Sequence, residues 1–390
     1  MRFPEFTEEW KAEQLDNIAT LSKGIGISKE QLSEDGEPCI LYGELYTKYK
    51  SEIIKQVESK TDINGSKLKR SKANDVIIPC SGETAVDIAT ARCVPFDNIL
   101  FGGDLNVISL HQYDGAFMSY QLNGKRKYDI ARVAQGVSIV HLYGEHLKAI
   151  KTYNPTLPEQ QKIAKLLSLL DDRIDTQNKI IEDLKKLKSA IVEMILCKQG
   201  GVLLKLGDVG SFIRGLTYSS EDIAEDINAT TVIRANNLNY GNNVSKKDVV
   251  YVNKKPTEIQ ILRKGDIVIC MANGSSSLVG KNSYYSFDDR QSTIGAFCGI
   301  YRSSQPLVKW LMQSQRYRRL VYQSLQGGNG AIANLNGDDI LNMTFYVVED
   351  KKSVSILSAL VLIENSIAVN EKLQELYSMQ KEYLLQHLFI

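Results

Sequence analysis

Clusters of arginine and lysine alternate along the chain with loops rich in asparagine and serine, and these residue types are suited to contacting nucleic acid. Arginine can donate two hydrogen bonds to guanine, asparagine pairs in the same way with adenine, and lysine and serine hold phosphates. The candidates in the first half are Lys67, Lys69, Arg70, Lys72, Ser81, Thr84, Lys125, Arg126, Lys127 and Arg132. Those in the second half are Arg234, Asn236, Asn237, Asn273, Ser275, Ser276, Lys281, Arg316, Arg318 and Arg319. A run of charges is also typical of a plain solvated surface, so the organisation of the chain has to decide between the two interpretations.

Catalytic motifs are missing from the sequence. It contains no GxxxxGK(S/T) phosphate loop, no HExxH, no GxSxG and no CxxC. The run Lys23–Ser28 begins like a dinucleotide-binding loop but lacks the third glycine, and Asn154-Pro155-Thr156 lacks the second proline and the ring of the motif that holds a flipped adenine. We therefore expect no catalysis by this chain alone. A nuclease with scattered carboxylates is the enzymatic alternative, and metal-dependent cleavage by the purified chain would support it.

The cysteines and histidines do not form a metal site. Zinc needs thiolates and imidazoles at close spacing, whereas these residues are scattered through the chain. They are Cys39, Cys80, Cys93, Cys197, Cys270 and Cys298, with His111, His141, His146 and His387. We expect no metal, reduced cysteines and a cytoplasmic protein. No run approaches about 18 apolar residues, so we expect no membrane partner.

The overall composition is that of a globular protein. Hydrophobic residues make up 43% of the 390 residues, and 47 Lys and Arg residues nearly balance 46 Asp and Glu residues. This composition excludes a disordered or collagen-like chain, and the length predicts two or three domains.

The sequence contains an internal repeat, in which the first half of the chain matches the second. Leu15–Ala19 followed by Lys23-Gly24 recurs as Leu206–Gly210 followed by Arg214-Gly215, 191 positions later. Asn74–Ile78 recurs as Gly265–Ile269 at the same offset, and Gln135–Leu142 matches Gly328–Leu335 at 193. Because three matches keep their order and spacing while most side chains differ, they indicate a duplication.

Each half ends in a long segment with a heptad pattern of apolar residues. Pro158 and Glu159 favour a helix start, and no glycine or proline interrupts the segment up to about Cys197. The predicted seam consists of Ile163, Leu167, Leu170, Ile174, Ile181, Leu184, Ile191 and Ile195, and then Ile356, Leu360, Ile363, Ile367, Tyr377, Leu384 and Leu388. The polar interruptions Gln177 and Lys188 recur as Asn370 and Lys381, 193 positions later. Helices of about 60 Å outreach the domains before them, so we expect the two seams to bury each other in a coiled coil.

These elements predict an α+β fold with four segments. Residues 1–157 form a first globular domain, 158–199 a first long helix, 200–348 a second globular domain and 349–390 a second long helix. The connectivity favours an antiparallel coiled coil, with two similar mixed α/β domains at its ends and an approximate twofold axis between them.

The sequence resembles the specificity subunits of type I restriction–modification systems. The resemblance is carried by Pro158–Ala164 (PEQQKIA), Leu170–Ile174 (LDDRI), Leu184–Lys188 (LKKLK) and Ile78–Thr84 (IPCSGET). The second copy departs from the pattern, because Val348–Lys352 lacks the prolines and the EQ pair.

The resemblance implies that each globular domain is a target recognition domain that reads one half of a bipartite double-stranded DNA target. It implies that the helices set the spacer and provide a platform for two methyltransferase subunits, and that restriction and translocase subunits join the complex. S-adenosylmethionine, ATP and magnesium would then bind to partner subunits, and this chain would hold no cofactor and have no catalytic residue. The alternative from another class is a coiled-coil adaptor that holds protein partners and has no salt-dependent affinity for DNA.

Overall fold

The computed structural model describes residues 2–197, 201–325, 333–348 and 350–390. These residues form two compact units, one of residues 1–179 and 370–390 and the other of residues 180–369. This division passes through both long helices, whereas the sequence predicts each helix as a segment of its own. The predicted boundaries at 199/200 and 348/349, and part of the repeat Gly328–Leu335, lie outside the described residues.

The first unit is built on a four-stranded antiparallel sheet with the strand order β2-β10-β6-β8. Its strand β6, Asp75–Pro79, is buried along its whole length, as the apolar run Val76–Ile78 predicts. A second sheet has the order β4-β3-β9-β5, and β1 pairs with β12. The remaining strands are β1 Lys11–Gln14, β2 Ala19–Lys23, β3 Glu37–Ile40, β4 Lys60–Thr61, β5 Lys69–Arg70, β7 Ser81–Gly82, β8 Arg92–Val94, β9 Leu100–Phe101, β10 Leu105–Leu110, β11 Val140–His141 and β12 Lys151–Asn154.

Short helices cover this sheet. They are α1 Leu15–Ile18, α2 Glu44–Thr47, α3 Ala85–Ile88, α4 Gly115–Asn123, α5 Lys127–Val133 and α6 Gly144–Lys148. Helix α4 begins after Asp114, whose carboxylate accepts a hydrogen bond of 2.7 Å from the amide of Phe117. Phe117 and Tyr120 on α4 are fully buried, and they form the surface on which the long helices pack.

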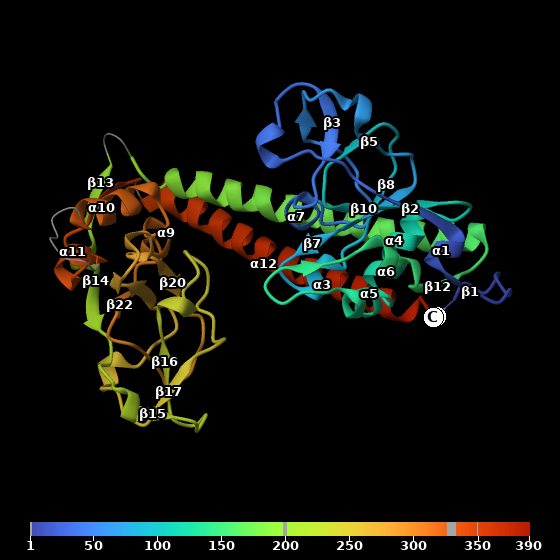
Figure 1. Cartoon of the computed structure of the whole chain (residues 1–390). Coiled ribbons are helices and arrows are strands. Elements are labelled where there is room, and N and C mark those ends of the chain that lie inside the picture. The colour runs from blue at the N-terminus through green and yellow to red at the C-terminus, as the bar shows by residue number, and fades with distance from the viewer. Residues whose placement is uncertain (1, 198–200, 326–332, 349) are drawn as a thin grey trace. The chain divides into compact units, whose positions relative to one another are not determined.

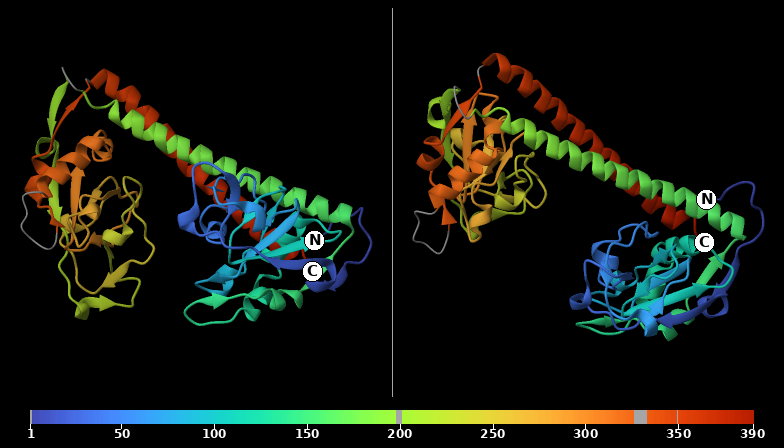
Figure 2. Two further views of the ribbon diagram at one scale, coloured as in Figure 1. Left: turned by 45° about the horizontal axis from the view of Figure 1, so that its top comes forward. Right: turned by 90° about the horizontal axis from the view of Figure 1, so that it is seen from above.

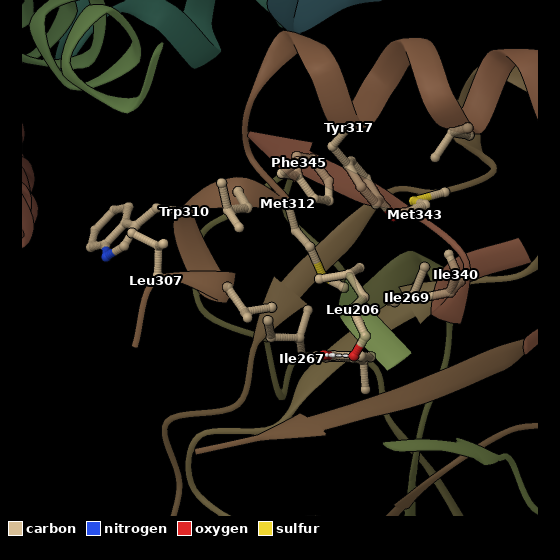
Figure 3. Packing of buried hydrophobic residues seen from close by; sticks show 14 of the residues in the cluster. Leu206, Ile267, Ile269, Leu307, Trp310, Met312, Tyr317, Ile340, Met343 and Phe345 are labelled. Carbon is tan, nitrogen blue, oxygen red and sulfur yellow. Dashed lines mark hydrogen bonds between the residues drawn. The ribbon is translucent and has the colours of Figure 1, made fainter. Parts of the chain in front are cut away.

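The second unit repeats the sheet order with β14-β22-β18-β20, and its other sheet has the order β15-β17-β16-β21. Its strands are β13 Val202–Lys205, β14 Gly210–Arg214, β15 Ile223–Ala224, β16 Thr230–Ile233, β17 Val250–Val252, β18 Ile267–Cys270, β19 Ala272–Asn273, β20 Asn282–Tyr284, β21 Ser292–Ile294, β22 Cys298–Ser303, β23 Ala333–Asn334 and β24 Thr344–Val347. Its short helices are α8 Leu206–Val209, α9 Val308–Leu311, α10 Gln315–Leu325 and α11 Gly337–Leu341. Figure 3 shows part of its core, where Leu206, Met312 and Phe345 lie among the strands and α9.

The repeated glycines have a packing role in both units. A Cβ atom on Gly24 would lie 2.0 Å from the carbonyl oxygen of Gly102, and one on Gly215 would lie 2.1 Å from that of Gly295. Only glycine allows the two backbones to approach so closely. The Lys23-Gly24 and Arg214-Gly215 repeats are therefore marks of the fold, and Lys23–Ser28 is part of this scaffold.

Two long helices, α7 Leu157–Glu193 and α12 Asp350–His387, lie side by side and run in opposite directions within each unit (Figures 1 and 2). In the first unit, Gln177 donates to Asn370, and Lys381 lies 2.6 Å from Asp171. In the second unit, Lys188 lies 3.2 Å from Glu364. The seam positions are all buried or half-buried. They are Ile163, Leu167, Leu170, Ile174, Ile181, Leu184, Ile191, Ile195, Ile356, Leu360, Ile363, Ile367, Tyr377, Leu384 and Leu388.

The start of α7 is fixed by the residues that carry the family resemblance. Glu159 is fully buried and accepts two hydrogen bonds of 2.7 Å from the Arg2 guanidinium. The Gln160 amide accepts from the backbone of Asp114 at 2.9 Å and donates to the carbonyl of Pro155 at 2.8 Å. This EQ pair therefore ties the helix to the first unit.

Helix α7 ends at Glu193, earlier than the predicted residue 199. Beyond it the backbone pairs with strand β24 and its neighbour: the amide of Cys197 donates to the carbonyl of Tyr346 at 2.8 Å, and that of Val348 donates to Ile195 at 2.9 Å. These bonds replace the helical ones, so the chain leaves the helix although no glycine or proline is present before Gly200.

Helix α12 is more apolar than α7 on its outer surface. Among the described residues, one helix, Ser353–His387, is long and apolar enough by length and composition to cross a membrane. Only 17% of the apolar window of this helix is buried within the structure, although Leu360, Ile367 and Leu384 are buried.

A buried lysine holds the C-terminal part of α12 to the first unit. The Lys381 ammonium lies 2.5 Å from Glu52 and 2.6 Å from Asp171, and the Tyr120 hydroxyl donates to Asp171 at 2.6 Å. Burial by itself lowers the pKa of Lys381, but the two carboxylates raise it above its usual value. The lysine is therefore charged in the folded protein, and together with the nearby buried Arg92 it offsets the charge of two buried acids.

We predict that Lys381→Met lowers the free energy of unfolding by about 3–5 kcal/mol, because it removes the ammonium that pairs directly with two buried carboxylates. Urea denaturation of the protein measures the loss of unfolding free energy. The matched control is Lys372→Met, which breaks an exposed ion pair with Glu375 and should cost less than about 1 kcal/mol.

The two variants should also differ in their dependence on pH. A lysine with a raised pKa stabilises the fold fully below its unfolded pKa of about 10.4, and this stability is lost as the pH rises through the folded pKa. Wild type and Lys381→Met should therefore converge in strongly alkaline solution. Equal stability of the two proteins at pH 7 would contradict the assigned role.

Candidate nucleic-acid interface

The structure brings three of the predicted contact residues of the second unit to one hollow. This Arg234 hollow has a volume of about 440 Å³ and is lined by Arg234, Asn236 and Asn273, together with the rings of Tyr218 and Phe297. Its remaining lining residues are Ala235, Ala272, Gly295, Ala296 and Cys298, so no carboxylate lines it. A guanidinium and two amides around one hollow match the side chains that read base edges.

The short turn after β16 positions these side chains. Its backbone is held by Asn237, whose Oδ1 accepts from the amide of Arg234 at 2.9 Å and whose Nδ2 donates to the carbonyl of Lys247 at 2.7 Å. Asn237 is buried with both ends of its amide used, so it shapes the turn and does not face a ligand, contrary to the sequence-based prediction.

The Arg234 guanidinium has a hydrogen-bond donor without a partner in the structure. One Nη2 hydrogen bond of 3.2 Å reaches the carbonyl of Asp248, while its Nε is buried without a partner. A buried donor without a partner costs free energy, and an acceptor on a ligand would remove that cost.

The second unit also has a second hollow, which is basic and is formed by other elements. This Tyr240 hollow of about 370 Å³ is lined by residues of α7, α10, α12, β20 and the adjoining loops, among them Lys185, Lys188, Lys281 and Arg318. The Lys281 ammonium lies 5.2 Å and the Arg318 guanidinium 5.4 Å from the centre of the Tyr240 ring. None of the residues that line this hollow is a carboxylate, so it favours an anion such as a phosphate.

Helix α10 places its arginines on the surface. Tyr317 and Val321 are buried, whereas Arg316, Arg318 and Arg319 are exposed. Ser276 lines the Tyr240 hollow, and Ser275 hydrogen-bonds Ser277 at 2.8 Å in the adjoining loop. Lys281, Arg318 and Ser276 are thus brought together, while Arg316 and Arg319 extend the basic surface along the helix.

The candidates in the first unit are more dispersed. Arg70 is held by Glu37 through contacts of 2.6 and 3.0 Å, and Thr84 caps α3 by accepting from the amide of Asp87. Ser81 lies on strand β7, and Lys67, Lys69 and Lys72 lie before β6 with Lys67 and Lys72 exposed. The structure does not gather these residues at one hollow.

The predicted cluster Lys125, Arg126, Lys127 and Arg132 lies near the end of α12. Arg126 donates to the carbonyl of Ile390 at 3.0 Å, Lys125 contacts that of Gln386 at 3.5 Å, and Arg132 pairs with Asp129 at 3.3 Å. Cations at a helix C-terminus stabilise it. Part of this cluster therefore serves docking of α12.

Sequence reasoning missed the aromatic members of both hollows. Phe297 has an exposed fraction of 69%, and Tyr240 has one of 48%. Phe297 lies in the turn between β21 and β22, two residues after the close approach at Gly295, and no sequence motif marks it.

Five of the six cysteines are buried, and Cys197 is half-buried. All six are free, and burial raises the pKa of the Cys80 thiol to about 11 and that of Cys298 to about 12. Among the described residues, no group of three or more His, Cys, Asp or Glu side chains is arranged to hold a metal ion.

Comparison with known proteins gives one consistent family. Residues 7–186 match the family model of the type I restriction modification DNA specificity domain. The chain is 28% identical over 164 residues to the type I restriction enzyme EcoKI specificity subunit of Escherichia coli K12, covering 40% of this chain and 35% of that protein. It is 24% identical over 294 residues to the MjaVIII specificity subunit of Methanocaldococcus jannaschii, covering 68% and 64%. The matched part thus spans about a third of the length of the first relative.

Solved structures share the fold. The S subunit of a type I restriction–modification system from M. genitalium superposes with a TM-score of 0.64 at 16% identity, covering 100% of this chain and 97% of that one. A chain from a structure on the assembly and conformational transition of the type I R-M system gives 0.57 at 13% identity, covering 98% and 97%.

Sequence and fold point to one class of protein, one with a DNA specificity domain. Residues 7–186 match that domain of type I restriction–modification systems, and the similar proteins are specificity subunits of such systems.

We predict that replacing Arg316, Arg318 and Arg319 with Ala weakens DNA binding and flattens its salt dependence. Each lost phosphate contact lowers the slope of log K against log salt by about 0.9. A salt titration of binding measures both effects. The control removes three exposed lysines of the long helices, Lys179, Lys186 and Lys372, and leaves the slope unchanged; an unaltered slope in the arginine variant would exclude α10 from the interface.

Proposed function

We propose that the chain is the non-catalytic specificity subunit of a type I restriction–modification complex and reads a bipartite DNA target with its two units. The observation that carries the proposal is that both units share one strand order but differ in the side chains that it presents. Where the second unit has Arg234, Asn236 and Asn273, the corresponding residues 193 or 191 positions earlier are Leu41, Gly43 and Gly82. One scaffold that presents different side chains at equivalent positions is suited to reading two different half-sites.

The contacts between the long helices support a coiled coil as the spacer. Gln177 and Asn370 are equivalent positions of the duplication, and they hydrogen-bond to each other. Equivalent residues meet in this way at a twofold axis. We infer an antiparallel, pseudo-twofold coiled coil whose length sets the distance between the half-sites, with the polar seam residues fixing its register.

The outer surface of α12 supports a platform for partner subunits. Leu362, Val369, Leu376 and Tyr383 follow each other at intervals of seven residues and are 66%, 67%, 49% and 52% exposed. This spacing is that of a second heptad seam, which fits a helix of another protein. We propose that methyltransferase subunits dock here, and that restriction and translocase subunits join the same complex.

The chemistry of the complex then belongs to the partners. S-adenosylmethionine would bind to the methyltransferase subunits, and ATP and magnesium to the subunits that translocate and cut DNA. The six free cysteines agree with a cytoplasmic location. The adaptor without DNA binding finds no support among the similar proteins.

We predict that a chimera in which residues 205–345 come from a relative changes only one half of the recognised sequence, because the second unit reads its half-site alone. Methylation mapping of the host genome, with the chain present, absent or replaced by the chimera, measures this. The reciprocal exchange of the first unit is the matched control. No chain-dependent methylation would refute the proposed function, and a change in both halves would refute the modular reading.

We further predict that Leu362→Glu abolishes co-purification of the methyltransferase subunit without lowering the thermal stability of the chain, because it puts a charge into an apolar contact. Ala368→Glu adds the same charge to a neighbouring exposed face of α12 and should retain the partner. Retention by both variants would place the docking surface elsewhere.

A further inference from the structure

Phe297 is an exposed ring on a firmly held backbone. It lies in the link between β21 and β22, where the amide of Cys298 donates to the carbonyl of Gly295 at 2.9 Å. The carbonyl of Phe297 accepts from the amides of Met271 at 2.8 Å and Ala272 at 3.3 Å. Three backbone hydrogen bonds thus hold the position of the residue, while 69% of its surface stays exposed.

The surroundings of the ring distinguish it from an ordinary exposed apolar residue. Single exposed apolar side chains are common on soluble proteins and need no explanation. Phe297, however, lines the Arg234 hollow together with Arg234, Asn236 and Asn273, and none of the residues that line this hollow is a carboxylate. Hydrogen-bonding groups of the kind that read bases therefore surround an apolar ring of the kind that proteins insert between base steps.

The first unit carries a different residue at the equivalent position. There the carbonyl of Asp104 accepts from the amide of Cys80 at 2.7 Å, just as Phe297 accepts from Met271. A carboxylate is repelled by phosphates and cannot enter a stack of bases without losing its hydration. The same backbone position thus presents a ring in one unit and a negative charge in the other.

We propose that Phe297 is an aromatic wedge that enters the DNA half-site read by the second unit and unstacks one base step there. This inference rests on the proposed function, because it requires that the second unit binds DNA. Arg234, Asn236 and Asn273 contact the base edges beside the opened step. The first unit binds its half-site without a wedge.

The test uses the full chain in complex with its methyltransferase subunits and a duplex that carries the sequence given by methylation mapping. 2-Aminopurine, whose fluorescence rises when it loses stacking, replaces one base at a time in each half-site. Methyltransferases flip their target base, so a rise at that base is expected in the wild-type complex and in Phe297→Ala alike. With the wild-type complex we expect one further rise, at another step of the half-site of the second unit, and no further rise in the other half-site. Phe297→Ala should abolish this further rise and weaken binding about tenfold or more, since stacking on an aromatic side chain contributes substantially to affinity.

A mismatch at the responding step provides a second measurement. Unstacking is easier at a mismatched base, so the mismatch should tighten binding by the wild-type complex relative to Phe297→Ala. Phe297→Trp keeps a ring and should keep the fluorescence signal. Ile259→Ala is the matched control, because Ile259 is 60% exposed in the same unit but does not line the Arg234 hollow.

The outcomes separate this inference from the proposed function. If the wild-type complex binds the mapped duplex but Phe297→Ala binds within twofold and gives the same fluorescence, the wedge is refuted and the proposed function stands. If Phe297→Ala keeps DNA binding but loses the methyltransferase subunit, the ring is a protein contact and the wedge is again refuted. If the wild-type complex does not bind the mapped duplex, the proposed function itself fails, and the wedge with it.

Discussion

A buried charge must keep a partner, and this requirement fixes how the long helices pack within each unit. In the first unit Lys381 lies between Glu52 and Asp171, so the C-terminal part of α12 cannot shift along α7 without leaving charges unpaired. In the second unit Lys188, at the equivalent position of α7, meets Glu364, which also binds Lys309. Burial lowers the pKa of Lys188 despite its carboxylate partner, whereas the two acids raise that of Lys381. An apolar seam alone tolerates register slips, and these polar positions remove that freedom.

The fold separates residues that maintain structure from residues that can vary. Gly24 and Gly215 keep equivalent backbone contacts in the two units, and the buried Asn237 holds the turn that presents Arg234 and Asn236. The positions around the Arg234 hollow differ between the units although the strands behind them follow the same order. A protein that has to read two unlike half-sites needs this separation, because a change of target must not disturb the core. Two of the residues that carry the family resemblance, Glu159 and Gln160, belong to the structural set, because both are buried and hold the start of α7.

Several features that could be predicted from the sequence depend on local periodicity. The heptad pattern predicted two long helices, and they are present as Leu157–Glu193 and Asp350–His387, with no seam position fully exposed. The end of α7 could not be predicted, because it is set by hydrogen bonds to Tyr346 and Val348, far away in the sequence. Arg126 appeared to be a nucleic-acid contact because it lies in a basic run, yet the chain's own C-terminal carbonyl is its partner. Neighbouring residues in the sequence do not reveal whether a charged side chain is exposed or has a partner elsewhere in the protein.

The sequence by itself therefore determined the duplication, the long helices, the absence of catalytic motifs and the family resemblance, since each depends on residue types at fixed spacing. Only the tertiary structure decided which polar residues meet. It gathered Arg234, Asn236 and Asn273 at one hollow, placed Phe297 and Tyr240 where no motif pointed, and took Asn237 and Arg70 into internal contacts. The physical reason is that each hollow is formed by loops that follow strands distant in the chain. Sheet order and backbone packing decide which loops meet, and local sequence patterns do not contain this information.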